Sequence, residues 1–92
     1  MFNLTEDQKT AVKNYAAAHA AFTAHYRLMM AAELMAQTVA VPGVQGKIER
    51  HEQELKIQAE EALWIGTNLG LTRDEIVCPR MAQYLPQPEM ED

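Results

Sequence analysis

Residues 15–37, YAAAHAAFTAHYRLMMAAELMAQ, decide the fold of this chain, because they read as the middle of one long helix. The stretch is rich in alanine, which loses the least free energy on becoming helical, and it contains neither glycine nor proline. Its only charges are Arg27 and Glu33, so the helix lacks the broad polar face of an ordinary surface helix. We therefore expect other helices to cover it on most sides.

The predicted helix extends beyond this stretch and covers about residues 6–40. Thr5 and Gln8 have the spacing of a capping box, in which each side chain bonds the backbone amide of the other residue. At the far end, the Pro-Gly pair at 42–43 stops the helix, because proline cannot continue it and glycine permits a turn. We therefore predict a turn over residues 41–46.

A second helix is predicted over about residues 47–69, and Gly70 supplies the left-handed residue that ends it. Its charged run is interpreted as a solvated face. Its apolar side chains recur at helical spacing and should face the first helix: Val44, Ile48, Leu55, Ala62, Ile65 and Leu69. A further capping box at Thr72 and Glu75 predicts a short C-terminal helix or turns over 73–85.

These elements predict an all-α fold, a long antiparallel helical hairpin with a short C-terminal helix that closes one end. A chain of 92 residues forms one domain, near the size at which a single core gives modest stability. We take residues 1–85 as that domain and the proline-broken, acidic residues 86–92 as a flexible tail. Because one hairpin partner cannot cover the first helix, we expect two chains to form a homodimeric four-helix bundle.

Two lines of side chains give the first helix two packing faces. The first line has the alternating spacing of a coiled-coil seam: Val12, Tyr15, His19, Phe22, Tyr26 and Met29. The second line combines small and apolar residues: Ala17, Ala21, Ala24, Leu28, Ala31 and Met35. We predict an interaction or dimer seam that draws on both lines and on the second helix: Tyr15, His19, Phe22, Tyr26, Met29, Leu28, Met35 and Trp64.

Composition restricts the class of partner and the compartment. The net charge of −5 argues against binding to nucleic acid phosphates, since that requires clustered lysine and arginine. Cys78 is the single cysteine, so no internal disulfide points to an oxidising compartment. The acidic N-terminus does not resemble a signal peptide, and no apolar run reaches membrane-spanning length. We expect a cytoplasmic protein without a membrane partner.

The sequence predicts no catalytic, cofactor-binding or metal-binding residues, and no cofactor. His19 and His25 stand six residues apart on different faces of one helix. His51 and Glu54 share a helix face, but such a pair is typical of a charged helix surface. Cys78 lacks a CxxC pattern or a neighbouring histidine. We therefore expect a protein that is not an enzyme.

Residues 62–85, ALWIGTNLGLTRDEIVCPRMAQYL, resemble a helix-turn-helix. Gly66, the turn glycine Gly70 and the capped start at Thr72 fall at the spacings of that motif. The resemblance implies a DNA-binding segment. It departs from the motif at Pro79, where the reading helix should continue. The same residues also suit a short helix that folds back over Trp64.

The leading functional hypothesis is a small acidic adaptor or inhibitor that binds an unidentified partner protein. Small helical proteins of this type occur in phages and mobile elements, which is a fold-level expectation only. The two-faced first helix and the absence of catalytic motifs favour this hypothesis. One alternative is a DNA-binding regulator that uses residues 62–85. Another is a structural subunit whose role depends on self-association.

Overall fold

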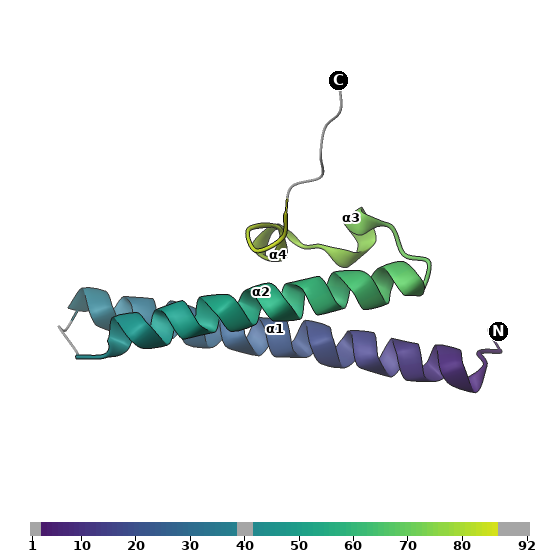
Figure 1. Cartoon of the computed structure of the whole chain (residues 1–92), viewed down its shortest axis with the longest axis horizontal. Coiled ribbons are helices and arrows are strands. Elements are labelled where there is room, and N and C mark those ends of the chain that lie inside the picture. The colour runs from purple at the N-terminus through teal and green to yellow at the C-terminus, as the bar shows by residue number, and fades with distance from the viewer. Residues whose placement is uncertain (1–2, 39–41, 87–92) are drawn as a thin grey trace, which may run out of the picture.

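The computed structural model describes residues 3–38 and 42–86 of the chain. Two long helices, α1 (Glu6–Thr38) and α2 (Val44–Asn68), lie antiparallel, and α3 (Arg73–Ile76) and α4 (Pro79–Ala82) lie along one flank (Figure 1). The predicted all-α helical hairpin is confirmed. The predicted end of the first helix at residue 40 and the predicted flexible tail beyond Pro86 lie outside the described residues.

Both predicted capping boxes are present. At the start of α1, the Gln8 backbone N–H donates to Thr5 Oγ1 at 3.2 Å, and the Thr5 N–H donates to Gln8 Oε1 at 2.9 Å. The same reciprocal pair joins Thr72 and Glu75 at the start of α3. There the Thr72 backbone N–H, and then its hydroxyl, hold the pKa of Glu75 below its ordinary value, because they hydrogen-bond the carboxylate.

The turn ends earlier than predicted, because α2 begins inside the predicted turn of residues 41–46, of which residue 41 lies outside the described residues. Gly43 adopts a φ of 84°, which glycine reaches without steric penalty, and α2 begins at the next residue. Val44 and Ile48 lie one helical turn apart and are both buried in the core. Their burial offsets the helix-weakening effect of Gly46, which the sequence alone placed in the turn.

The core lies between the two long helices and beneath the C-terminal segment. Its buried apolar residues come from all four helices and from Leu85, which follows α4: Ala18, Phe22, Met29, Val44, Ile48, Leu55, Ala59, Ala62, Ile76, Met81 and Leu85. The predicted apolar line of α2 is therefore largely confirmed. In contrast, α1 buries only three of its 33 residues. Within the described residues, no helix combines the length and apolarity needed to cross a membrane.

The C-terminal segment, residues 71–86, runs back along the flank of the hairpin (Figure 1). Gly70 has a φ of 87°, and this left-handed residue turns the chain at the end of α2 as predicted. The prediction that a short helix closes one end of the hairpin is wrong. Pro79 keeps Cys78 extended, so the segment forms two one-turn helices that follow the side of the hairpin.

Two contacts anchor this segment. Ile76 crosses α2 at Gly66, where an added Cβ would lie only 2.6 Å from Ile76 Cγ1 and 3.2 Å from Tyr15 Cε2. Further along, the Tyr84 ring meets the Phe22 ring edge-on, with centroids 5.9 Å apart. The absence of a side chain at Gly66 thus permits the close approach that brings Tyr84 onto α1.

Candidate functional site

The structure divides the predicted interaction seam into three groups. Phe22 and Met29 are buried within the chain, so they serve the core of a single copy. A second group is half-buried beside them: Tyr15, His19 and Tyr26. The third group is exposed: Leu28, Met35 and Trp64. Of the predicted seam, the second and third groups are therefore the ones that reach the surface.

Trp64 lies on the outer side of α2 and is 70% exposed. The interpretation that residues 62–85 fold back over this side chain is therefore wrong. The C-terminal segment instead covers the side of α2 that carries Gly66. Trp64 and Gly66 are two residues apart, and such residues do not share a helix face.

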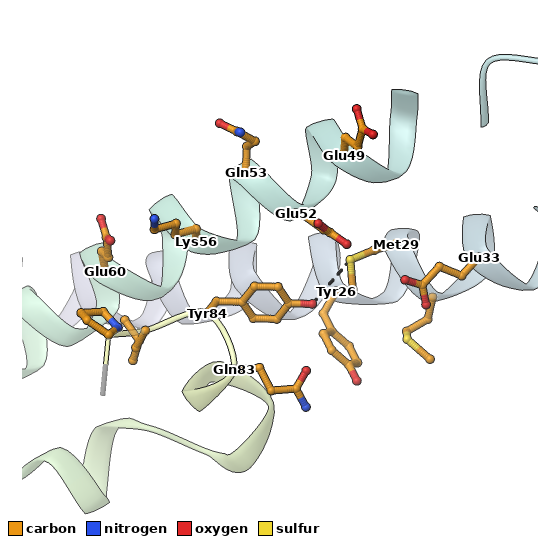
Figure 2. Close-up of a pocket in the computed structure, with 13 residues that line it drawn as sticks. Tyr26, Met29, Glu33, Glu49, Glu52, Gln53, Lys56, Glu60, Gln83 and Tyr84 are labelled. Carbon is orange, nitrogen blue, oxygen red and sulfur yellow. Dashed lines mark hydrogen bonds between the residues drawn. The ribbon is translucent and has the colours of Figure 1, made fainter. Parts of the chain in front are cut away.

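A groove of about 950 Å³ lies between α1, α2 and the end of the C-terminal segment (Figure 2). We call it the acidic groove. The residues that line it come from three separate parts of the chain: Tyr26, Met29, Met30, Glu33, Glu49, Glu52, Gln53, Lys56, Glu60, Gln83, Tyr84, Leu85 and Pro86. Of these, only Tyr26 and Met29 belong to the seam predicted from the sequence.

Carboxylates dominate the charge of the groove. Glu49, Glu52 and Glu60 lie along α2, and Glu33 lies opposite them on α1 (Figure 2). Lys56 is the one basic residue among the lining side chains. Like charges along a low-dielectric wall reinforce one another's field, so the groove attracts cations from solution.

Tyr84 forms the centre of the apolar floor. Its hydroxyl donates to Met29 Sδ at 3.5 Å, drawn as a dashed line in Figure 2. Burial raises the pKa of the Tyr84 hydroxyl above its ordinary value, and the nearby Tyr26, Glu52 and Glu33 add to the shift. The phenol is therefore neutral at physiological pH and offers an uncharged aromatic surface beneath the carboxylates.

The chain itself places a cation on this aromatic surface. The Arg80 guanidinium carbon lies 5.3 Å from the centroid of the Tyr26 ring, within the range of a cation–π interaction. Tyr26 also stacks on Phe22, with ring centroids 6.1 Å apart. The Tyr26 ring is thus held in place by the buried Phe22, and the Arg80 guanidinium lies over it.

A second polar cluster links the long helices. His25 Nδ1 on α1 lies 2.7 Å from Glu54 Oε2 on α2, and His51 Nδ1 lies 3.8 Å from the same oxygen. The sequence placed His51 and Glu54 on one helix face, but it compared His25 only with His19, which lies on a different face of the same helix. The contact between His25 and Glu54 depends on how the two helices are aligned in the hairpin, which residue spacing along one helix does not predict.

The segment that resembles a helix-turn-helix has the predicted turn at Gly70 and the predicted cap at Thr72. Its second helix, α3, is only four residues long. Val77 is extended before α4 begins, which separates the two short helices. DNA-reading helices of this motif lie in the major groove and present several side chains to the bases. DNA binding by this segment stays a prediction.

Comparison with known protein families, with curated proteins and with solved structures found no match to this chain. The functional proposal therefore depends on the groove, the exposed surfaces and their charge.

Proposed function

We propose that this protein is an adaptor or inhibitor that binds a basic segment of a partner protein in its acidic groove. One observation carries the proposal: an aromatic floor and four glutamates, against one lysine, line the same groove. Lysine and arginine side chains are attracted by both components, through ion pairs with the carboxylates and through cation–π contacts with the rings. A neutral or acidic segment would gain neither interaction.

The Tyr26–Arg80 contact supports this choice of partner chemistry. A guanidinium of the chain's own lies over the Tyr26 ring, in the geometry expected for a basic side chain of the partner. Met30 lines the same groove and is 46% exposed, and its flexible side chain adapts to apolar residues that flank the basic ones. The preferred segment therefore alternates basic with apolar side chains.

The charge of the whole chain favours the same partner. A net charge of −5 speeds the encounter with a basic surface through long-range attraction. A basic surface that normally binds nucleic acid would be blocked by such an encounter, which is the mode of action expected of an inhibitor. The lone cysteine fits a cytoplasmic location for this protein.

The proposal includes no catalytic activity. A useful general base has a pKa near the operating pH, whereas the raised pKa of Tyr84 keeps its proton bound there. The glutamates of the groove are spread along α2 and across to α1, an arrangement that suits several cationic groups in a row. Binding is therefore the function that we assign to the groove.

A second copy of this chain is a second candidate partner. Leu28, Leu34 and Met35 are 54%, 63% and 54% exposed on the outer side of α1. Two copies that pair these faces would complete a four-helix bundle and bury the apolar side chains. A structural oligomer built from this dimer would use the same face of α1.

The DNA-binding alternative for residues 62–85 is the weaker proposal. Asp74 and Glu75 occupy the first turn of α3, where a reading helix would approach the phosphates. Their charges repel the DNA backbone. Arg73 is the basic residue of that short helix, and its guanidinium donates to the Pro86 carbonyl at 3.2 Å.

A selection from a random peptide display library tests the proposal. The immobilised baits are the wild-type protein, a groove variant (Glu49→Gln with Glu52→Gln) and a control variant (Asp7→Asn with Glu61→Gln). Both variants lose the same charge, but the control positions lie outside the acidic groove. Wild type and control should enrich peptides rich in lysine and arginine, while the groove variant should bind those peptides about tenfold more weakly.

Two results would contradict the proposal. The first is that the enriched peptides show no bias toward basic residues, which would mean that the carboxylates of the groove do not select the ligand. Alternatively, the groove variant could bind them as tightly as the control variant does, which would place binding elsewhere. Measurement at two salt concentrations adds a check, because screening should weaken binding to the wild type.

A further inference from the structure

We infer that His25, His51 and Glu54 form a site for zinc or a similar first-row divalent metal ion, which would join α1 to α2. Each residue offers one ligand atom, and the three atoms lie within 4.8 Å of one another. The site shares no residue with the acidic groove, so the inference is independent of the proposed function.

The two distances to Glu54 require shifts below about 1 Å, and the two imidazole rings, whose centroids lie 6.0 Å apart, must turn toward each other. Zinc binds imidazole nitrogen at about 2.0–2.1 Å and carboxylate oxygen at about 2.0–2.2 Å, so tetrahedral ligand atoms lie about 3.4 Å apart. His25 Nδ1 and Glu54 Oε2, now 2.7 Å apart, would separate by roughly 0.7 Å. His51 Nδ1, now 3.8 Å from that oxygen, would approach by roughly 0.4 Å. Rotation of the histidine and glutamate side chains would supply such movements while both helices stay in place.

The two ring nitrogens need a partner. The Nδ1 atoms of His25 and His51 are shielded from solvent, and neither makes a well-aligned hydrogen bond within the described residues. The short distance from His25 to Glu54 lacks the alignment of an N–H···O bond. A buried polar atom without a partner is destabilising. A metal ion would take the lone pairs of both nitrogens together with the carboxylate charge.

The ligand set indicates the kind of ion. Imidazole suits zinc, copper and nickel, whereas calcium and magnesium prefer sets of oxygen ligands. His51 and Glu54 lie three residues apart on one helix, and His25 comes from the neighbouring antiparallel helix, as in metal sites built between the helices of bundles. Three protein ligands leave a fourth position for water or for a side chain of another molecule.

The three side chains reach the protein surface, although the two Nδ1 atoms themselves are shielded. The side chains of His25 and His51 are 27% and 25% exposed, and that of Glu54 is 41% exposed. One helical turn away, Ala21 and Gln58 line a shallow groove of about 410 Å³ that continues from the same face of the hairpin. Rotation of the two imidazole rings would expose the Nδ1 atoms to an ion without unfolding of either helix.

Isothermal titration of metal-free, untagged protein with zinc chloride tests the inference. We expect one ion to bind each chain and the melting temperature to rise when zinc is present. His25→Gln, His51→Gln and Glu54→Gln should each weaken zinc binding at least tenfold. His19→Gln is the matched control, because His19 contacts the Tyr15 ring outside the cluster and its loss should leave zinc binding unchanged.

A cobalt titration gives a second measurement. Tetrahedral cobalt in the site should produce visible absorption bands that the Glu54→Gln variant loses. If His25→Gln lowers the helix content of the metal-free protein in circular dichroism, the Glu54→Gln variant tests the metal site instead, because glutamine has the shape of glutamate without its charge. The inference is overturned if zinc gives no heat and no thermal shift with the wild-type protein. It is equally overturned if the His19 and His25 variants lose zinc binding to the same extent.

Discussion

Replacement of Gly66 by alanine tests whether the C-terminal segment packs on the hairpin as described, and hence whether the acidic groove has its third wall. An alanine Cβ at this position would lie 2.6 Å from Ile76 Cγ1 and 2.7 Å from Ile76 Cδ1. Ile76 is only 2% exposed, so its side chain has little room to move. The substitution therefore forces a methyl group into an occupied space.

Two opposing effects set the change in the free energy of unfolding that Gly66→Ala causes. Alanine within a helix is more stable than glycine by up to about 1 kcal/mol. Overpacking a filled core is destabilising by about 1–3 kcal/mol, and here the second effect is larger. We expect Gly66→Ala to lower the free energy of unfolding by roughly 1 kcal/mol. Gly46→Ala is the matched control, since a Cβ at Gly46 meets no atom within 4 Å and should be neutral or stabilising.

Urea denaturation followed by circular dichroism measures both variants. Limited trypsin digestion gives a second readout, because a segment that detaches from the hairpin exposes Arg73 and Arg80 to faster cleavage. In an Ile76→Ala background, both clashing atoms are absent, so Gly66→Ala should no longer destabilise the protein. The reasoning is refuted if Gly66→Ala is as stable and as resistant to trypsin as Gly46→Ala.

Two further predictions concern association and pH. Leu28→Glu combined with Met35→Glu should convert the dimer to a monomer in sedimentation analysis, because the charges would lie in the dimer interface. Helix content should be retained, since both side chains are about half exposed in the single chain. Ile57→Glu on α2 is the control, and a wild-type protein that is already monomeric would contradict the dimer. Because burial raises the pKa of Tyr84, its proton stabilises the fold below the ordinary tyrosine pKa near 10, and this stabilisation is lost as pH rises through the raised value. Urea denaturation between about pH 8 and about pH 11 should show a steeper loss of stability for the wild type than for Tyr84→Phe, and equal slopes would exclude this cause.

The sequence predicts the helices well where the signals are local. The cap at Thr5 and the cap at Thr72 each depend on a residue three positions later, and both are present. Gly70 likewise ends α2 in the left-handed conformation that a glycine permits. The start of α2 could not be placed in this way. Its early beginning depends on the burial of Val44, which is a tertiary effect.

The candidate sites depend on long-range geometry that the sequence does not contain. The acidic groove forms because the C-terminal segment runs along the flank and brings Tyr84 to Met29, 55 residues away in the chain. The cluster around Glu54 forms because the hairpin register brings His25 opposite His51. Helix periodicity predicts which side chains share a face, but it does not predict which faces meet.

The most direct test of the acidic groove as a binding site is to map where a basic peptide binds on the protein. We would titrate ¹⁵N-labelled protein with a blocked oligo-arginine peptide and follow the backbone amide resonances. We predict shift changes concentrated at Glu33, at residues 49–60 and at residues 83–85, and their loss in the Glu49→Gln with Glu52→Gln variant. Equal changes around Asp7, or the same shifts in that variant, would contradict a role for the acidic groove.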